Sequence, residues 1–161
     1  MPHFFCRRLL FGIFFGGVTA CPSEVRTLRQ MKRVAVISSD KTLERAVVLA
    51  LECAAAGKVE VVAAANDGDA DRIADCIADC DTVVVLGAAW FSSGRLSAEA
   101  LRNGCRRHGD RRTEIYVVSW QHGEQTVLGM LESGIDQYMT FPLSLRRLCI
   151  KVLGPRWAAA R

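Results

Sequence analysis

The chain has 161 residues, which is enough for one domain of ordinary size. Half of the residues are hydrophobic and 24% are charged, so a largely disordered chain is excluded. The net charge of +4 is uneven, because residues 1–30 carry +3 while the remaining residues carry 17 basic and 16 acidic side chains. The near-neutral body gives no reason to expect nucleic acid as a partner.

Residues 1–30 are predicted to be a leader outside the fold. Two arginines precede twelve apolar or small residues (9–20), a pattern that resembles a secretory signal peptide. The end of this run, Val-Thr-Ala-Cys, also resembles a lipobox in which Cys21 would be lipidated. Met31 opens Met-Lys-Arg directly before a β-rich run, which instead favours a start codon assigned too early. We expect a cytoplasmic protein, with an exported or lipid-anchored form, and hence a membrane contact, as the alternative.

The body alternates β-rich runs with amphipathic helical patterns. In chain order the sequence predicts a strand at 33–38, a helix capped by Asp40 and stopped by Gly57, a strand at 58–65, a helix at 69–80, a strand at 82–86, a helix that begins at Ser97, a strand at 114–119, a helix at 121–133, a strand at 135–140 and a helix at 144–153.

This strict alternation predicts a parallel sheet covered on both faces by helices. Residues 82–86 form a continuous β-branched run, as expected of a central strand buried on both sides. The fold class is α/β: a flavodoxin-like, doubly wound (βα)5 three-layer sandwich with a five-stranded parallel sheet of order 2-1-3-4-5. The predicted domain spans residues 31–154, and residues 155–161 form a tail.

Sheets of this kind place their functional groups at the carboxyl ends of the strands. The residues to inspect are therefore those that close each strand, namely Ser38, Ser39 and Asp40, then Leu86, Gly87 and Ala88, then Ser119 and Trp120, and finally Thr140, Phe141 and Pro142.

Residues 132–145, Glu-Ser-Gly-Ile-Asp-Gln-Tyr-Met-Thr-Phe-Pro-Leu-Ser-Leu, resemble a response-regulator receiver domain of the CheY-like family. That family enters its last strand through an E-A-G-A-D-D-Y phrase and leaves it through K-P-F-S-L. The resemblance extends in pattern and length over residues 31–153.

Receivers accept a phosphoryl group on an aspartate that closes the third strand. Two acidic side chains after the first strand hold Mg²⁺, and a lysine after the fifth strand pairs with the phosphoryl oxygens. In this chain Ser38 and Ser39 replace the acidic pair, Leu86 or Gly87 falls at the acceptor position, and Phe141 replaces the lysine. The resemblance therefore implies a degenerate pseudo-receiver that is not an enzyme, performs no phosphorelay chemistry and needs no cofactor.

Part of the receiver switch is retained. Ser119 matches the hydroxyl residue after the fourth strand and Tyr138 matches the aromatic residue on the fifth, so the resemblance implies that the two are coupled. Alternatively, Tyr138 is a half-buried strand aromatic with a local partner. Asp40 is acidic, but one carboxylate makes a poor Mg²⁺ site. We expect a cis Phe141–Pro142 bond, and Phe141 filling the former phosphate pocket.

Other features are weaker signals. Trp90 and Phe91 follow the third strand in a predicted loop, where they cap the pocket or form a contact surface. The arginines between 102 and 112 are interpreted as a solvated helix end, with a patch for an acidic partner or phosphate as the alternative. The five body cysteines include no CxxC pair, so we expect no metal site and a reducing compartment.

We therefore expect a stand-alone, bacterial-type two-component signalling module that acts by protein–protein interaction. A protein partner or a second copy should bind the face formed by the helix at 121–133, the strand at 135–140 and the helix at 144–153. The alternative is a flavodoxin-like domain that binds a small molecule or phosphate, with Ser38, Ser39 and Ser119 as hydrogen-bonding groups. A lipid-anchored envelope protein is a third interpretation.

Overall fold

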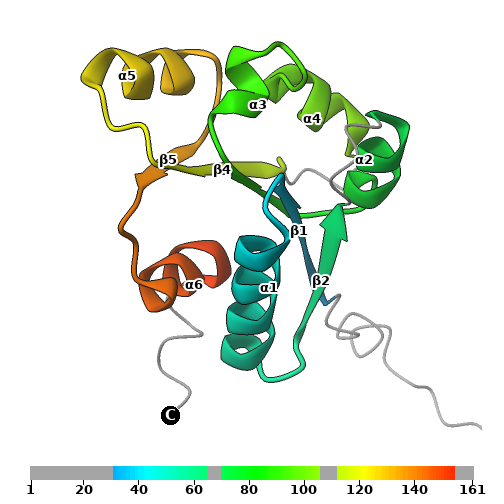
Figure 1. Cartoon of the computed structure of the whole chain (residues 1–161). Coiled ribbons are helices and arrows are strands. Elements are labelled where there is room, and N and C mark those ends of the chain that lie inside the picture. The colour runs from blue at the N-terminus through cyan, green and yellow to red at the C-terminus, as the bar shows by residue number, and fades with distance from the viewer. Residues whose placement is uncertain (1–30, 65–69, 106–111, 155–161) are drawn as a thin grey trace, which may run out of the picture. The chain divides into compact units, whose positions relative to one another are not determined.

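The computed structural model describes residues 31–64, 70–105 and 112–154 (Figure 1). The predicted leader, the tail, His108 and three of the arginines between 102 and 112 lie outside these ranges. The elements are β1 (Lys32–Ser38), α1 (Lys41–Ala55), β2 (Val59–Ala64), α2 (Ala70–Ile77), β3 (Thr82–Leu86), α3 (Ala89–Ser92), α4 (Ala98–Gly104), β4 (Glu114–Ser119), α5 (Glu124–Glu132), β5 (Gln137–Thr140) and α6 (Leu145–Leu153).

The five strands form one parallel sheet in the order β2-β1-β3-β4-β5, which confirms the predicted topology. The pairing register aligns the strand ends. Ser38 pairs with Leu86 across β1 and β3, and Ser119 pairs with Thr140 across β4 and β5. The residues singled out from the sequence therefore gather at the end of the sheet where the carboxyl ends of the strands lie.

The sheet lies between two helical layers (Figure 1). Helices α1 and α6 cover one face, and α2, α3, α4 and α5 cover the other. Successive strand residues point to opposite faces, so each β-branched run supplies both layers of the core. In β3, Val83 and Val85 join one buried cluster while Val84 and Leu86 join the other. Burial on both faces explains why this strand has no polar alternation.

Four helix and strand predictions need correction. Helix α2 ends at Ile77 rather than at Cys80, because the chain turns at residues 78–79 and the N–H of Cys80 donates to the carbonyl oxygen of Ile77. Residues 89–92 form the short helix α3, so there are six described helices where five were predicted. Helix α5 begins at Glu124 rather than at 121, because both backbone polar groups of Gln121 are bonded outside a helix. Strand β5 begins at Gln137, because the Asp136 carboxylate takes the backbone N–H of Ile115 in place of a strand carbonyl.

Asp136 also fixes the entry of β5 to its neighbours. Its carboxylate accepts hydrogen bonds from the backbone N–H of Ile115 (2.8 Å), from Arg102 (3.1 Å) and from Arg112 (2.9 Å). Arg102 donates as well to the carbonyl oxygen of Gly134. One half-buried carboxylate thus links α4, β4 and the turn before β5.

No helix within the described ranges is long and apolar enough to cross a membrane.

Candidate functional site: the strand ends and the α5–β5–α6 face

The groups that follow β1 are engaged in local hydrogen bonds. The buried Ser38 hydroxyl donates to the carbonyl oxygen of Asp40 (2.9 Å) and accepts from its N–H (3.0 Å). The Asp40 carboxylate accepts from the N–H groups of Thr42 (2.8 Å) and Leu43 (3.1 Å), which makes it the predicted N-cap of α1. The one acidic side chain retained at this strand end therefore stabilises a helix.

The corner after β3 holds no side chain that accepts a phosphoryl group. Leu86 is buried in the core cluster under α1 and α6. Gly87 donates its N–H to the carbonyl oxygen of Val118 (2.8 Å) and has a φ of +120°, a conformation that L-residues rarely adopt. The backbone itself therefore disfavours any residue with a side chain at position 87.

Trp90 packs beside this corner. A Cβ atom placed on Gly87 would lie 3.8 Å from the indole Cδ1. Trp90 belongs to helix α3 and is only 6% exposed, in the core cluster on the opposite face of the sheet from α1. The predicted loop is thus a helix, and burial rules out Trp90 as a contact surface in this conformation. Phe91, half-buried, packs against the same cluster.

The loop between β4 and α5 is held at Gln121 from two sides. The buried Ser119 hydroxyl accepts from the N–H of Gln121 (3.2 Å). The Tyr138 hydroxyl donates to the carbonyl oxygen of Gln121 (2.8 Å), while its ring packs against the core. Ser119 and Tyr138, the two switch candidates, are therefore joined through one backbone residue. Gln121 was missed at the sequence level, because its side chain takes no part.

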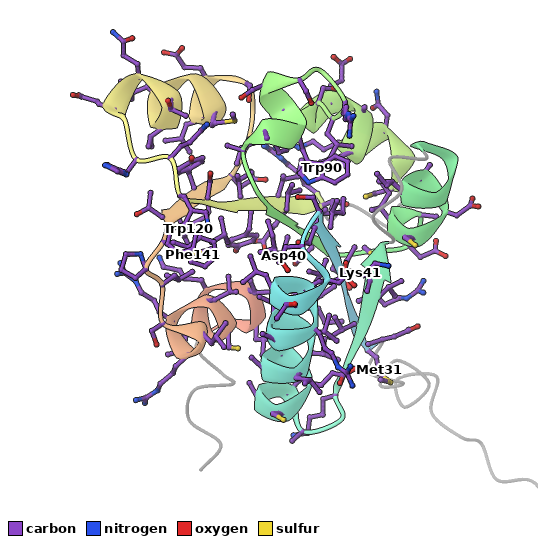
Figure 2. The ribbon with its side chains drawn as sticks, viewed as in Figure 1. Met31, Asp40, Lys41, Trp90, Trp120 and Phe141 are labelled. Atoms are coloured by element: carbon purple, nitrogen blue, oxygen red, sulfur yellow. The ribbon has the colours of Figure 1, made fainter. Side chains whose placement is uncertain are left out.

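An aromatic stack covers the ends of β4 and β5 (Figure 2). The rings of Trp120 and Phe141 have centroids 4.5 Å apart and planes inclined by 29°. Phe141 is half-buried against the core cluster under α1 and α6, and its bond to Pro142 is cis, as expected. Trp120 is 69% exposed. Apolar packing therefore occupies the strand end where a receiver would carry its lysine.

A second candidate site lies along the sheet edge formed by β5. We define the α5–β5–α6 face as the exposed residues of these three elements together with Trp120, which precedes α5. The described residues include six exposed large hydrophobic side chains, and four of them are on this face: Trp120, Leu128, Leu131 and Leu145. Isolated exposed apolar residues are ordinary, but a group of them on one face indicates an interaction surface.

The two helices of this face also carry exposed charged side chains. Helix α5 carries Glu124 and Glu132, and helix α6 carries Arg146, Arg147 and Lys151, all exposed. No salt bridge joins any of these five side chains to another described residue. Within the described ranges, the face thus combines exposed apolar groups with charged groups that have no ion-pair partner.

The cysteines offer no metal site in the described part of the chain. All five body cysteines are free thiols, and no group of three or more His, Cys, Asp or Glu side chains there is placed to hold a metal ion. Cys76 and Cys80 do not share a helix face, because α2 ends at Ile77. Burial raises the pKa of the Cys80 thiol to about 12 and so keeps it protonated and unreactive.

Comparisons with known proteins support the fold. No protein-family model matches the chain, and no curated protein matches it. A CpaE pilus assembly protein from Burkholderia thailandensis is 21% identical, with a TM-score of 0.58, and the match covers 80% of this chain and 99% of that chain.

Two receiver domains match in the same way. A CheY-like receiver domain protein from Methanospirillum hungatei is 16% identical, with a TM-score of 0.56 over 80% of this chain and 94% of that chain. The receiver domain of the Francisella response regulator 1452 is 17% identical, with a TM-score of 0.54 over 81% and 99% of the two chains. The chain therefore has the fold of response-regulator receiver domains, as the sequence resemblance implied.

Proposed function

We propose that this chain is a receiver-like signalling module that works without aspartyl phosphorylation, by binding a protein on its α5–β5–α6 face. The observation that carries the proposal is the concentration of exposed apolar side chains there, four of the six in the described residues. Trp120 is the natural anchor, because tryptophan is enriched among residues that dominate binding energy and this indole is 69% exposed.

The strand ends support the absence of phosphotransfer. Phosphoryl transfer to a receiver needs an acceptor carboxylate, a divalent cation and a positive charge close together. Here Gly87 follows β3, Phe141 follows β5, and the Asp40 carboxylate caps α1. None of the three required groups is supplied by these positions.

The β4–α5 loop supports a fixed presentation of the face. Ser119 and Tyr138 hold the two backbone polar groups of Gln121, and the adjacent Trp120 stacks on Phe141. These contacts keep the indole at the surface without any covalent modification. A partner would therefore bind the unmodified protein.

Acetyl phosphate tests the first half of the proposal. The chain is incubated with acetyl phosphate and Mg²⁺ and its intact mass is measured. We expect no phosphoryl adduct that hydroxylamine removes, whereas a stoichiometric, hydroxylamine-labile adduct would overturn the claim of phosphorylation independence.

Site-specific photo-crosslinking tests the second half. A photoreactive residue replaces Leu128 on α5, and in a matched control it replaces Leu49 on α1, which is as exposed (51% against 49%). In the protein's own host we expect a defined crosslinked protein from position 128 and none from position 49. Equal yields at both positions, or none at position 128, would contradict the proposed face.

The small-molecule alternative has less support. Two of its three proposed hydrogen-bonding serines, Ser38 and Ser119, are buried and engaged with backbone groups. Only Ser39 is exposed. Titration with inorganic phosphate, followed by amide chemical shifts at Ser39, would revive this alternative if those resonances moved at submillimolar phosphate.

Pilus assembly is the cellular process that we propose to test first. Its support is the fold-level similarity to the CpaE pilus assembly protein, which covers 99% of that chain. Deletion of the gene in its host, followed by electron microscopy of surface pili, gives the readout. Unchanged pili would remove this process while leaving the binding proposal intact.

A further inference from the structure

Two of the five thiols in the described residues belong to helices that pack against each other. Helices α1 and α6 cover the same face of the sheet and lie side by side there (Figure 1). Cys53 lies near the end of α1, and Cys149 lies in the middle of α6. Both are free thiols in this structure. Each of the two packed helices therefore carries one thiol.

Cys149 lies in the core between these helices and the sheet. Its side chain is buried and belongs to the core cluster that also contains Val47, Leu51 and Ala55 of α1. Those three residues recur at i, i+4 and i+8, so they mark the side of α1 that faces the core. The thiol of α6 is therefore packed in the layer that α1 covers.

Cys53 lies at the solvent side of the same helix pair. It is two residues beyond the buried Leu51, or about 200° around the helix, and it is exposed. Burial raises the pKa of the Cys149 thiol, and the sulfur of Cys53 raises that pKa further. Because such an interaction weakens with distance, the two sulfurs are neighbours across the contact between α1 and α6.

The other described thiols lack this arrangement. Cys80 and Cys105 are buried, and Cys76 is half-buried. All three lie in or against the core cluster on the opposite face of the sheet. The Cys80 thiol donates to the carbonyl oxygen of Cys76 (3.3 Å). Within the described residues, only Cys53 is an exposed thiol that a dissolved reagent reaches directly.

We propose that Cys53 and Cys149 form a redox site, at which a low-molecular-weight disulfide such as oxidised glutathione converts the two thiols into one disulfide that joins α1 to α6. The site does not depend on the proposed function, because neither thiol belongs to the α5–β5–α6 face. Disulfides in a reducing compartment are usually of this transient, redox-sensing kind.

The reaction consists of two thiol–disulfide exchange steps. The Cys53 thiolate attacks one sulfur of the small disulfide, whose S–S bond breaks, and one small thiolate leaves. The Cys149 thiolate then attacks the Cys53 sulfur of the mixed disulfide and releases the second small thiolate. The protons of the two cysteines pass to the two leaving thiolates. The protein thiols thus lose two electrons, and the small disulfide gains them and becomes two thiols.

Exposure and burial set the order of these steps. Cys53 is exposed, so it meets the small disulfide first. Cys149 is buried and its raised pKa keeps it protonated, so it reacts second, with a sulfur that is already held beside it. The new bond closes a loop that contains four of the five strands. A bond that closes so long a loop restricts the unfolded chain and stabilises the folded one.

Peptide mapping tests the site. The full chain is equilibrated at neutral pH in buffers with a rising ratio of oxidised to reduced glutathione, its free thiols are alkylated, and it is digested with trypsin. Trypsin cleaves after lysine and arginine, so Cys53 falls in peptide 46–58 and Cys149 in peptide 148–151. We expect these two peptides to be joined in an amount that rises with the ratio, and dithiothreitol to separate them.

Serine variants provide the matched controls. Cys53→Ser should abolish the joined peptides, whereas Cys76→Ser, at a half-buried thiol on the opposite face, should leave them. Cys149→Ser should retain glutathione on Cys53, because the second step then has no thiol. In urea, the oxidised unmodified chain should unfold at a higher midpoint than the reduced chain, and Cys53→Ser should lose this shift.

Three outcomes would overturn the redox site. Glutathione that persists on Cys53 in the unmodified chain would show that the Cys149 thiol does not reach it. A disulfide between Cys53 and any other cysteine would assign a different pair. Two thiols that remain reduced at the most oxidising ratio would show that there is no redox site. None of these outcomes bears on the proposed function, which the crosslinking from position 128 tests separately.

Discussion

The strand ends and the α5–β5–α6 face use their polar groups in opposite ways. At the strand ends, the side chains of Ser38, Asp40 and Ser119 form hydrogen bonds with nearby backbone groups. On the face, Glu132 and Arg147 have no ion-pair partner among the described residues. In the proposed function, the strand ends therefore serve the fold and the α5–β5–α6 face serves binding.

The difference follows from what each region does for the fold. A serine or aspartate beside a helix start stabilises the folded chain whether or not it binds a metal. An exposed Leu128 or Trp120 stabilises the folded chain little, so such residues gathered on one face are better explained by binding than by folding. Perturbations of the two regions should therefore separate stability from association.

The largest expected effect on the free energy of unfolding comes from alkaline pH. It arises from two buried groups that belong neither to the strand ends nor to the α5–β5–α6 face. Burial raises the pKa of Cys80 from an ordinary 9.0 to about 12, and burial together with Glu114 raises that of Tyr116 from 10.0 to about 12. At a pH between the ordinary and the raised pKa, each group is deprotonated in the unfolded chain and protonated in the folded chain. The free energy of unfolding should therefore fall as pH rises from 9 to 12.

Urea denaturation at a series of pH values measures this slope. Cys80→Ala should reduce the slope to the part that Tyr116 contributes, whereas Cys53→Ala, at an exposed position, should reduce it less. An equal slope in Cys80→Ala and in the unmodified chain would show that the thiol is not the source.

The next largest effect is expected at Asp136, which holds the entry of β5 and hence the framework of the face. Asp136→Ala leaves the N–H of Ile115 without its acceptor and the half-buried Arg102 without its carboxylate partner, and should lower the free energy of unfolding by about 3 kcal/mol. Arg112→Ala removes an exposed ion pair with the same carboxylate and should cost less than about 1 kcal/mol. Chemical denaturation of both variants gives the comparison, and equal losses would contradict it.

Much of the fold was predictable because the signals are local. The β-rich runs at Thr82–Leu86 and Glu114–Ser119 predicted two strands, and the structure has both with the same bounds. Asp40 was predicted as a cap and accepts two backbone N–H groups of α1. Ser97 likewise marks the start of α4, where its side chain accepts the N–H of Ala100.

The errors arose where distant residues decide local structure. The start of α5 depends on Tyr138, 17 residues away, which takes the carbonyl oxygen of Gln121. At the candidate site, the absence of the receiver's charged residues was readable from the sequence. The φ of Gly87 and the stacking of Trp120 on Phe141 could not be predicted from the sequence, because both depend on how β3, β4 and β5 end beside one another.

Restoring an acceptor at the strand ends should fail for a backbone reason. At a φ of +120°, Gly87→Asp and Gly87→Ala should each lower the free energy of unfolding by about 1–2 kcal/mol. The added Cβ itself meets nothing closer than 3.8 Å. Gly129→Ala, within α5 and with no neighbour within 4 Å of its Cβ, should instead gain up to about 1 kcal/mol. A stable Gly87→Asp that acetyl phosphate labels would break the contrast between the two regions.

The smallest loss of stability among these strand-end and β5 carboxylates is expected at Asp40. Substitutions there distinguish helix capping from metal binding. Asp40→Ala removes the acceptor for Thr42 and Leu43 and should cost about 1 kcal/mol by thermal or urea denaturation. Asp40→Asn keeps an amide oxygen in the same place and should cost only a few tenths of a kcal/mol, since asparagine caps helices about as well. Added Mg²⁺ should leave the stability of the unmodified chain unchanged. Stabilisation by millimolar Mg²⁺ that Asp40→Asn abolishes would mean that this carboxylate still binds a cation, and the strand ends would then retain part of the receiver's chemistry.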